Sequence, residues 1–235
     1  MKPEYRLHYA PDNASLVIRL VLEELGQPYE TLLVDRRAEA QNSPAYRALN
    51  PNGLIPVLET PDGPLFETAA ILLWLSERHG AMAPQPGSAD RAAFLKWLVF
   101  ASNTLHADLR MLFYPEKYIG PEQAHKAQLQ TVLRQRLDQH LTNLDQAAAA
   151  RPAWLGAPQP SVLDYYLACQ IRWMALYPAQ ADKSWFTLAH YPSLQRLCAA
   201  LEHRPAVAVS REAEGLGATP FTSPAYANPP EGSAT

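Results

Sequence analysis

Two short stretches of this sequence hold residue types that suit the binding of a short peptide with a charged end. The first, Asn50–Leu58, is a turn whose Ile55–Pro56 bond leads directly into an apolar strand. A cis bond before proline has a low cost, and an outward-facing backbone there could pair with an extended peptide. The second, Phe66–Ile71, opens a helix with Glu67 and Thr68, where backbone N–H groups and the helix dipole favour a carboxylate.

The side chains of the second stretch extend this chemistry. The Thr68 hydroxyl would donate to a bound carboxylate, and Glu67 would suit an ammonium group. A ligand that carries a carboxylate and an ammonium group on one carbon would bind both side chains at once. Each stretch alone is more typical of an ordinary turn proline or an ordinary helix cap, whereas the two together favour a binding site.

Composition restricts the classes of function. The chain has 235 residues, 48% of them hydrophobic and 18% charged, which fits one large or two small globular domains. A formal net charge of -3 gives no reason to expect a nucleic-acid partner. The apolar run Ala69–Leu75 is far shorter than the roughly 20 residues of a membrane span, so we expect no membrane association.

The N-terminus and the cysteines predict a cytoplasmic protein. Residues 1–6 include no apolar segment typical of a secretory signal. Cys169 and Cys198 lie in helix-like segments and are expected to be buried free thiols. The histidines are scattered, without the spacing of a metal site, so we expect no metal.

Residues 1–83 have the pattern of a small α/β domain. The order strand-helix-strand-helix-strand-strand-helix implies a parallel pair followed by a hairpin, and so a mixed four-stranded sheet covered by helices. A tight turn is expected at Pro61–Pro64. The expected strands are Tyr5–Tyr9, Tyr29–Val34, Val57–Thr60 and Leu65–Phe66, and the expected helices are Ser15–Leu25, Ser43–Leu49 and Thr68–His79.

Residues 84–217 read as an all-helical bundle, and residues 218–235 as an extended proline-rich tail. Leucines recur at helical spacing between Leu129 and Leu144. Ser161–Asp164 resembles a capping box at the start of another helix. In the tail, Phe221 and Tyr226 could dock onto the body of the protein.

The order of these motifs resembles the cytosolic glutathione transferase family along nearly the whole chain, up to Gly217. The resemblance rests on four segments: Asn50–Leu58, Phe66–Ile71, Ser161–Asp164 and Tyr191–Val207. It implies a thioredoxin-like N-terminal domain that binds glutathione, an all-α C-terminal domain and a homodimer. The glutathione-binding residues that it implies are Leu54, Ile55, Pro56, Glu67 and Thr68.

The residue that activates the glutathione thiol is the open question. The segment from Pro11 to Leu16 is most similar to bacterial beta-class members, which have a cysteine where this chain has Ala14. Three candidates remain. Ser15 is the first choice, because its hydroxyl and the helix dipole would act together at the helix start, although a plain N-cap has the same pattern. Tyr9 could donate from the end of the first strand or be a core aromatic. Asn13 could donate an amide hydrogen bond to the sulfur or simply form a turn. Asp12 is not a candidate and is expected to face solvent, because its negative charge would oppose formation of a thiolate.

A polar stripe on the first bundle helix suits the second substrate. In the family this helix lines the pocket that faces the thiol. The stripe would favour an anionic or carboxylated acceptor, although a solvated helix face shows the same pattern. Leu54 stands where many members have a polar contact to glutathione, which weakens that contact or indicates a more apolar ligand. The stripe comprises Asn103, His106, Arg110, Tyr114 and Lys117.

The resulting prediction is a glutathione-dependent transferase that uses glutathione as co-substrate and attacks a small electrophile. A lyase, isomerase or dehalogenase on the same fold is an alternative. So is a non-catalytic binding or regulatory protein, which Ala14 and Leu54 favour.

Overall fold

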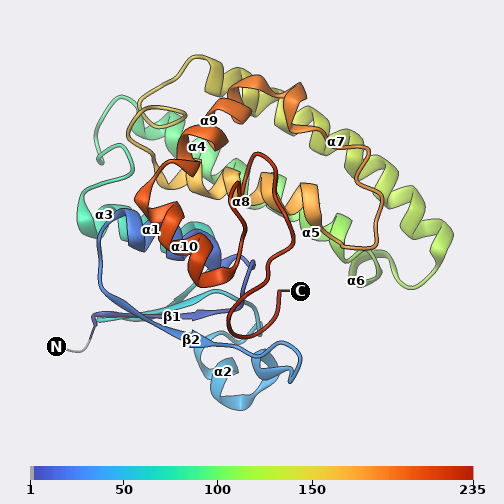
Figure 1. The fold of residues 1–235 in the computed structure, drawn as a ribbon, viewed down its shortest axis with the longest axis horizontal. Helices are drawn as coiled ribbons and strands as arrows, with labels where there is room; N and C mark the ends of the chain where they lie inside the picture. The colour runs from blue at the N-terminus through green and yellow to red at the C-terminus, as the bar shows by residue number, and fades with distance from the viewer. Residues whose placement is uncertain (1–2, 235) are drawn as a thin grey trace.

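The computed structural model describes residues 3–234, in which a four-stranded sheet with flanking helices precedes a helical bundle (Figure 1). The sheet has the order β2-β1-β3-β4, with β1 parallel to β2 and antiparallel to β3, and β3 antiparallel to β4. The predicted mixed sheet and all-helical second part are therefore confirmed. The strands are β1 (Tyr5–Tyr9), β2 (Tyr29–Leu33), β3 (Val57–Thr60) and β4 (Gly63–Phe66).

Helices cover both faces of the sheet. The helices α1 (Ser15–Glu24) and α3 (Thr68–His79) lie between the sheet and the bundle, whereas α2 (Pro44–Leu49) lies on the opposite face (Figure 1). Because successive strand side chains point to opposite faces, Leu7 of β1 joins the main core while its neighbour His8 packs against Tyr46 of α2.

The hairpin between β3 and β4 is tighter than predicted. Gly63 pairs with Thr60, so Pro61 and Asp62 alone form the turn and the strand begins at Gly63 rather than at Leu65. Gly63 has φ +113°, a conformation that L residues rarely adopt. The extra pairing extends the ladder toward the turn.

The bundle is organised around α8 (Val162–Leu176), in which every residue except Ala175 is buried. Its predicted capping box is confirmed: the Ser161 hydroxyl accepts from the backbone N–H of Asp164, whose carboxylate accepts from the Ser161 N–H at 2.7 Å. The other helices of the described bundle are α4 (Arg91–Phe100), α5 (Ala107–Phe113), α6 (Glu116–Ile119), α7 (Gln123–Ala149), α9 (Pro192–Glu202) and α10 (Pro205–Glu214).

The predicted first bundle helix contains a π-helical segment. This segment, η2 (Ala101–His106), joins α4 to α5 without a break. Its i→i+5 hydrogen bonds widen the turn, and such segments are frequent at functional sites. The widened turn changes which side chains share a face.

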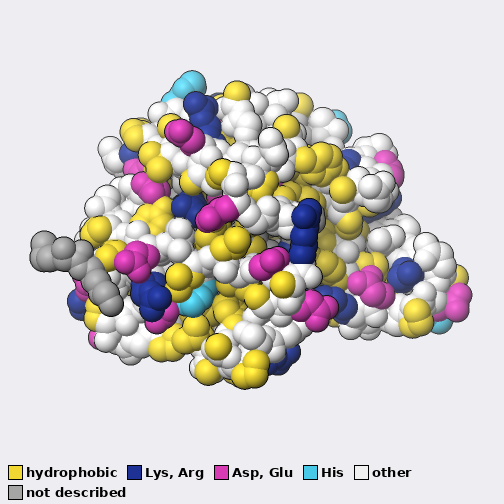
Figure 2. All heavy atoms as spheres, turned by 60° about the horizontal axis from the view of Figure 1, so that its bottom comes forward, with side chains coloured by type: hydrophobic (Ala, Val, Ile, Leu, Met, Phe, Trp, Pro, Cys, Tyr) yellow, Lys and Arg dark blue, Asp and Glu magenta, His cyan; other side chains and the backbone are white. Residues whose placement is uncertain are grey.

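The chain after α10 returns along the bundle to the sheet (Figure 1), where Gly232 packs closely against Leu33 of β2. Earlier in this segment, Phe221 is buried beside Glu202 of α9, so this residue docks onto the body of the protein, a point that the sequence left open. On the face shown in Figure 2, acidic and basic side chains are interspersed rather than gathered into a patch of one sign. Within residues 3–234, no helix combines the length and apolar character of a membrane span.

Candidate functional site

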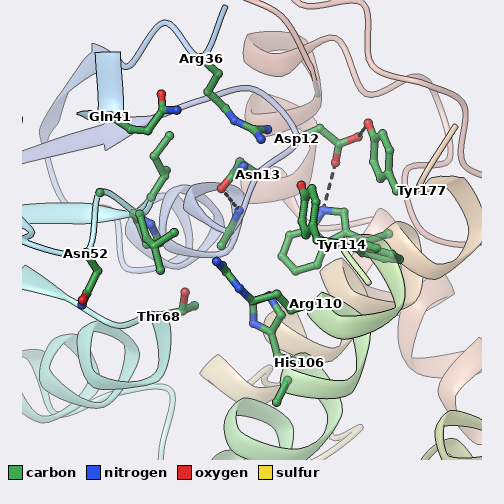
Figure 3. A pocket seen from close by; sticks show the side chains of 18 of the residues that line it. Asp12, Asn13, Arg36, Gln41, Asn52, Thr68, His106, Arg110, Tyr114 and Tyr177 are labelled. Carbon is green, nitrogen blue, oxygen red and sulfur yellow. Dashed lines mark hydrogen bonds between the residues drawn. The ribbon is translucent and has the colours of Figure 1, made fainter. Parts of the chain in front are cut away.

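A cavity of about 900 Å³ lies between the sheet domain and the bundle, and Figure 3 shows it from close by. One side is formed by the first loop, Ala10–Ala14, by the second loop, Asn50–Pro56, and by the start of α3. The other side is formed by η2, α5 and the end of α8. The second loop and the α3 start, which the sequence singled out separately, thus open into one space.

The second loop is held firmly in place. The Leu54 carbonyl accepts hydrogen bonds from the Tyr46 hydroxyl and from Asn50 Nδ2, both at 2.8 Å. The Ile55–Pro56 bond is cis, as predicted. Leu54, Ile55 and Pro56 all line the cavity, and Leu54 is 37% exposed.

The start of α3 presents the helix end to the same space. Glu67 precedes the helix with φ +70°, a strained conformation for a residue with a side chain. Thr68 is 7% exposed, and both residues line the cavity. The first N–H groups of a helix have no intrahelical acceptor, so this end suits an anionic ligand group.

Ser15, the first predicted donor to sulfur, begins α1 but lies outside the cavity lining among the described residues. It is fully buried. Its hydroxyl donates to the Ala10 carbonyl at 3.1 Å and accepts from the Ala10 N–H at 3.3 Å. Because these bonds close the first loop from within, Ser15 is placed as a structural residue.

Tyr9, the second candidate, also points away from the cavity. Its hydroxyl donates to the Glu231 carboxylate near the C-terminus, and its ring lies 4.8 Å beneath the Arg19 guanidinium. Burial, together with the Glu231 carboxylate, raises the pKa of Tyr9. A phenol held in this way is not placed to donate to a ligand in the cavity.

Asn13, the third candidate, does line the cavity, as does its neighbour Ala14. Asn13 Oδ1 accepts a hydrogen bond from the Ala14 N–H at 2.8 Å (Figure 3). This bond fixes the side-chain amide, so that Nδ2 is the group offered to a ligand. Of the three predicted donors, the structure brings only Asn13 to the cavity.

The prediction that Asp12 faces solvent is wrong. Asp12 is 3% exposed, with φ +52°, and its carboxylate accepts from Arg172, Trp173 and Tyr177. The Arg172 pair is bidentate, with both N–O distances 2.8 Å. A buried carboxylate needs such partners, and the guanidinium offsets the charge that would otherwise oppose a nearby thiolate.

Sequence reasoning missed Arg36 and Gln41, which also line the cavity. Arg36 Nη1 and Gln41 Oε1 are both buried without a hydrogen-bond partner among the described residues. Buried polar atoms normally have partners, so these two atoms are available to bind a polar group of a ligand in the cavity. The strand topology could have indicated Arg36. It follows β2 as the first loop follows β1, and the carboxyl ends of these two parallel strands lie at the same edge of the sheet.

On the bundle side, His106, Arg110, Tyr114 and Lys117 line the cavity as predicted from their spacing, but Asn103 does not. Asn103 is exposed, and Ser102 takes its place. In the wide turn of η2, residues four apart lie closer to one face than residues three apart. The ordinary helical spacing used for the prediction therefore selected the wrong neighbour.

His106 is an uncharged member of this wall. Its Nδ1 lies 2.8 Å from the Tyr166 hydroxyl, and its ring centroid lies 5.5 Å from that of Trp173. Burial, and then the neighbouring Arg110 guanidinium, lower the pKa of His106 to about 4. The positive charge of the wall at neutral pH therefore comes from Arg110 and Lys117.

Those two cations are oriented by aromatic neighbours. Arg110 Nε donates to the Tyr118 hydroxyl at 3.0 Å, and Lys117 Nζ lies 4.6 Å from the Tyr114 ring centroid. Figure 3 shows Arg110, Thr68 and Asn13 around the same space. An anionic molecule that reaches from the α3 start to α5 would meet a donor at each end.

The protein's own sulfur chemistry is restricted. Cys169 and Cys198 are buried and unpaired, and burial raises the pKa of both thiols. No described Cys, His, Asp or Glu side chains form a group of three or more that could hold a metal ion.

Comparison with known proteins identifies the family. Residues 14–78 match the model of the glutathione S-transferase N-terminal domain, and residues 122–200 match that of the C-terminal domain. The glutathione S-transferase GstB of Escherichia coli is 30% identical over 193 residues, which cover 81% of this chain and 88% of GstB. The chain belongs to the glutathione S-transferase family.

Two solved glutathione transferases share the fold of this family member. One, from Burkholderia graminis, has two glutathione molecules bound per subunit; it is 28% identical with a TM-score of 0.76, over 90% of this chain and 88% of that one. The other, a sphingomonad enzyme complexed with glutathione, is 29% identical with a TM-score of 0.73. The match covers 90% of this chain and 100% of that one. In this transferase, Ala14 stands where the beta-class resemblance implies a cysteine.

Proposed function

We propose that this chain transfers glutathione to a small electrophile and uses Asn13 as the donor to the sulfur. The observation that carries the proposal is the meeting of Ile55, Glu67, Thr68 and Asn13 in one cavity. The solved relatives with bound glutathione support the choice of ligand.

Each end of glutathione would have a matching group. The γ-glutamyl carboxylate would lie at the start of α3 on the Thr68 hydroxyl, with the ammonium beside Glu67. The peptide backbone would lie along Ile55. The glycyl carboxylate would reach Arg36, whose buried Nη1 lacks a partner among the described residues.

The thiol would then lie beside Asn13 and Ala14. A free thiol has a pKa of about 8.5, and the thiolate is the nucleophile. A hydrogen bond from Asn13 Nδ2 would favour the thiolate by about 1 kcal/mol, which corresponds to somewhat less than one pKa unit. The thiol proton passes to solvent, the sulfur forms a bond to the electrophilic carbon, and any leaving group departs with its electron pair.

Calorimetry and turnover of a model electrophile test this proposal. We expect glutathione to bind, and Asn13→Ala to lower kcat while Ser15→Ala leaves the chemical step unchanged. Absence of binding at millimolar glutathione would contradict it. Binding without turnover would favour the regulatory alternative, and turnover confined to an isomerisation or elimination substrate would favour the lyase or isomerase.

We propose further that the electrophile is anionic. Arg110 and Lys117 supply the positive charge on the bundle side, where His106 is neutral. Arg110→Gln should raise KM roughly tenfold for a carboxylated electrophile, the effect of one charge-assisted hydrogen bond, and leave KM for an uncharged one unchanged. Equal effects on both substrates would contradict an anionic preference.

The quaternary structure and location remain proposals. The homodimer implied by the family resemblance is tested by sedimentation, with one species at twice the chain mass expected. The cytoplasmic location expected from the sequence stays a prediction.

A further inference from the structure

The segment after α10, residues 218–234, makes a continuous set of contacts that ends at the sheet; we call it the tail. Near its start is the buried Phe221, whose N–H donates to the Glu202 carboxylate at 2.8 Å, as does the N–H of Thr222. The tail then passes the end of α8 and reaches β2 (Figure 1). It lies beyond residue 200, where the match to the family's C-terminal domain ends.

Arg172 connects the tail to the first loop. Its side chain, in α8, is fully buried, and it holds both carboxylate oxygens of Asp12. The same guanidinium donates to the Pro220 carbonyl at 3.0 Å and to the Ala225 carbonyl at 2.9 Å. Two tail carbonyls thus accept hydrogen bonds from the same guanidinium that fixes Asp12, the residue directly before Asn13.

Tyr226 connects the tail to the bundle side of the cavity. Its hydroxyl donates to the carbonyls of Leu176 and Ala179, at 3.0 and 3.3 Å, and its ring packs edge-on against Tyr177 at 5.9 Å. Tyr177 and Ala179 line the cavity, and the Tyr177 hydroxyl donates to Asp12 at 2.6 Å. Asp12 is therefore held from two directions by groups that contact the tail.

The far end of the tail is attached to the base of the first loop. Glu231 accepts the Tyr9 hydroxyl at the end of β1. Gly232, with φ +71°, packs so closely that a Cβ added there would lie 2.7 Å from Leu33 and 3.4 Å from Pro11. These contacts occupy the phenol that the sequence suggested as a thiol donor.

We propose that the tail is a positioning element of the glutathione site, which holds the first loop and the Tyr177–Ala179 wall from behind. The proposal rests on the proposed function, because the site that the tail supports is the glutathione site. Among the described residues, none of the tail lines the cavity. The tail therefore acts on sulfur through Asp12 and Asn13, and Arg172, Tyr226 and Glu231 are positioning residues.

Two substitutions in the full-length protein test this role, Tyr226→Ala and Glu231→Ala. We expect each substitution to lower kcat roughly fivefold, which is the effect of losing one hydrogen bond. Each should also move the pKa of the bound glutathione thiol toward its free value. Tyr226→Phe keeps the ring and loses only the hydroxyl, so its effect should be smaller. Glu212→Ala, an exposed carboxylate of α10, is the matched control.

The readouts separate positioning from folding. A tail that only stabilises the fold would lower the melting temperature and the active fraction, with KM, kcat per active site and the bound thiol pKa unchanged. That result would overturn the inference, as would identical kinetics in Tyr226→Ala, Glu231→Ala and wild type. Failure of the wild type to bind glutathione would instead overturn the proposed function, and this inference with it.

Discussion

The first and second loops face the same cavity but are held in different ways. The second loop, Asn50–Pro56, is fixed by Tyr46 and Asn50, which lie eight and four residues from the Leu54 carbonyl that they bind. The first loop is fixed by Arg172 and Glu214, which are 160 and 202 residues from Asp12. Local contacts thus form the part that binds the ligand, whereas distant contacts orient the part that acts on its sulfur.

Breaking the long-range support should have the largest effect on stability. We predict that Arg172→Met lowers the free energy of unfolding by about 3–5 kcal/mol, because it leaves the buried Asp12 carboxylate without its counter-ion. Denaturant unfolding gives the value. Arg78→Met, which breaks an exposed pair with Glu4, should cost less than about 1 kcal/mol and is the control. Equal losses would contradict the distinction.

The bundle wall offers a test through pH. The folded pKa of His106, about 4, lies below its ordinary value of 6.5, so the unfolded chain binds the proton first as pH falls. The neutral, folded His106 therefore contributes at most about 3 kcal/mol to the free energy of unfolding. This contribution is fully present above pH 6.5 and is lost as pH falls toward 4. We predict a shallower fall over this window in His106→Asn. The control is His125→Asn, at an exposed position in α7, which should lose stability with pH as the wild type does. If His106→Asn lost stability as steeply as the wild type, His106 would not be held neutral in the folded protein.

Changing the binding side should affect affinity but not stability. Glu67→Gln removes the partner proposed for the ligand ammonium, and we predict a roughly tenfold weaker Kd for glutathione by calorimetry, the effect of one charge-assisted bond. Glu122→Gln, at an exposed carboxylate before α7, serves as the control. If Glu67→Gln bound glutathione as tightly as wild type, the placement of the γ-glutamyl end would be wrong.

The smallest expected effect separates two neighbours in the first loop. Asn13→Ala should lower kcat by roughly fivefold, since it removes one neutral hydrogen bond to sulfur. Ser15→Ala should leave kcat unchanged and lower the melting temperature, because its hydroxyl binds only Ala10 in the structure. Steady-state kinetics and thermal unfolding on the same samples give both values. The reverse pattern would restore Ser15 as the activating residue.

What the sequence predicted well is what depends on local rules. The strands, the cis bond before Pro56, the start of α3 at Thr68 and the Ser161 capping box all follow from residues close together in the chain. Turn, cap and periodicity signals describe such neighbours directly. The opening of Glu67 and Thr68 into the same cavity as Ile55 then follows from the sheet topology.

What the sequence did not predict depends on distant partners or on unusual backbone. Nothing near Asp12 indicates that Arg172 will neutralise it, so solvent exposure was the natural expectation. Tyr9 could not be assigned until the tail was seen to bring Glu231 to its hydroxyl. Asn103 was selected by ordinary helical spacing, which the π-helical segment η2 alters.

The pKa of the glutathione thiol bound to this protein tests the central claim most directly. Ultraviolet absorbance of the thiolate, followed against pH with glutathione saturating, gives this value for wild type, Asn13→Ala and Ser15→Ala. We predict a wild-type pKa below the free value of about 8.5, a return toward that value in Asn13→Ala, and no change in Ser15→Ala. An unchanged pKa in Asn13→Ala, or a rise confined to Ser15→Ala, would contradict the assignment of Asn13 as the donor to sulfur.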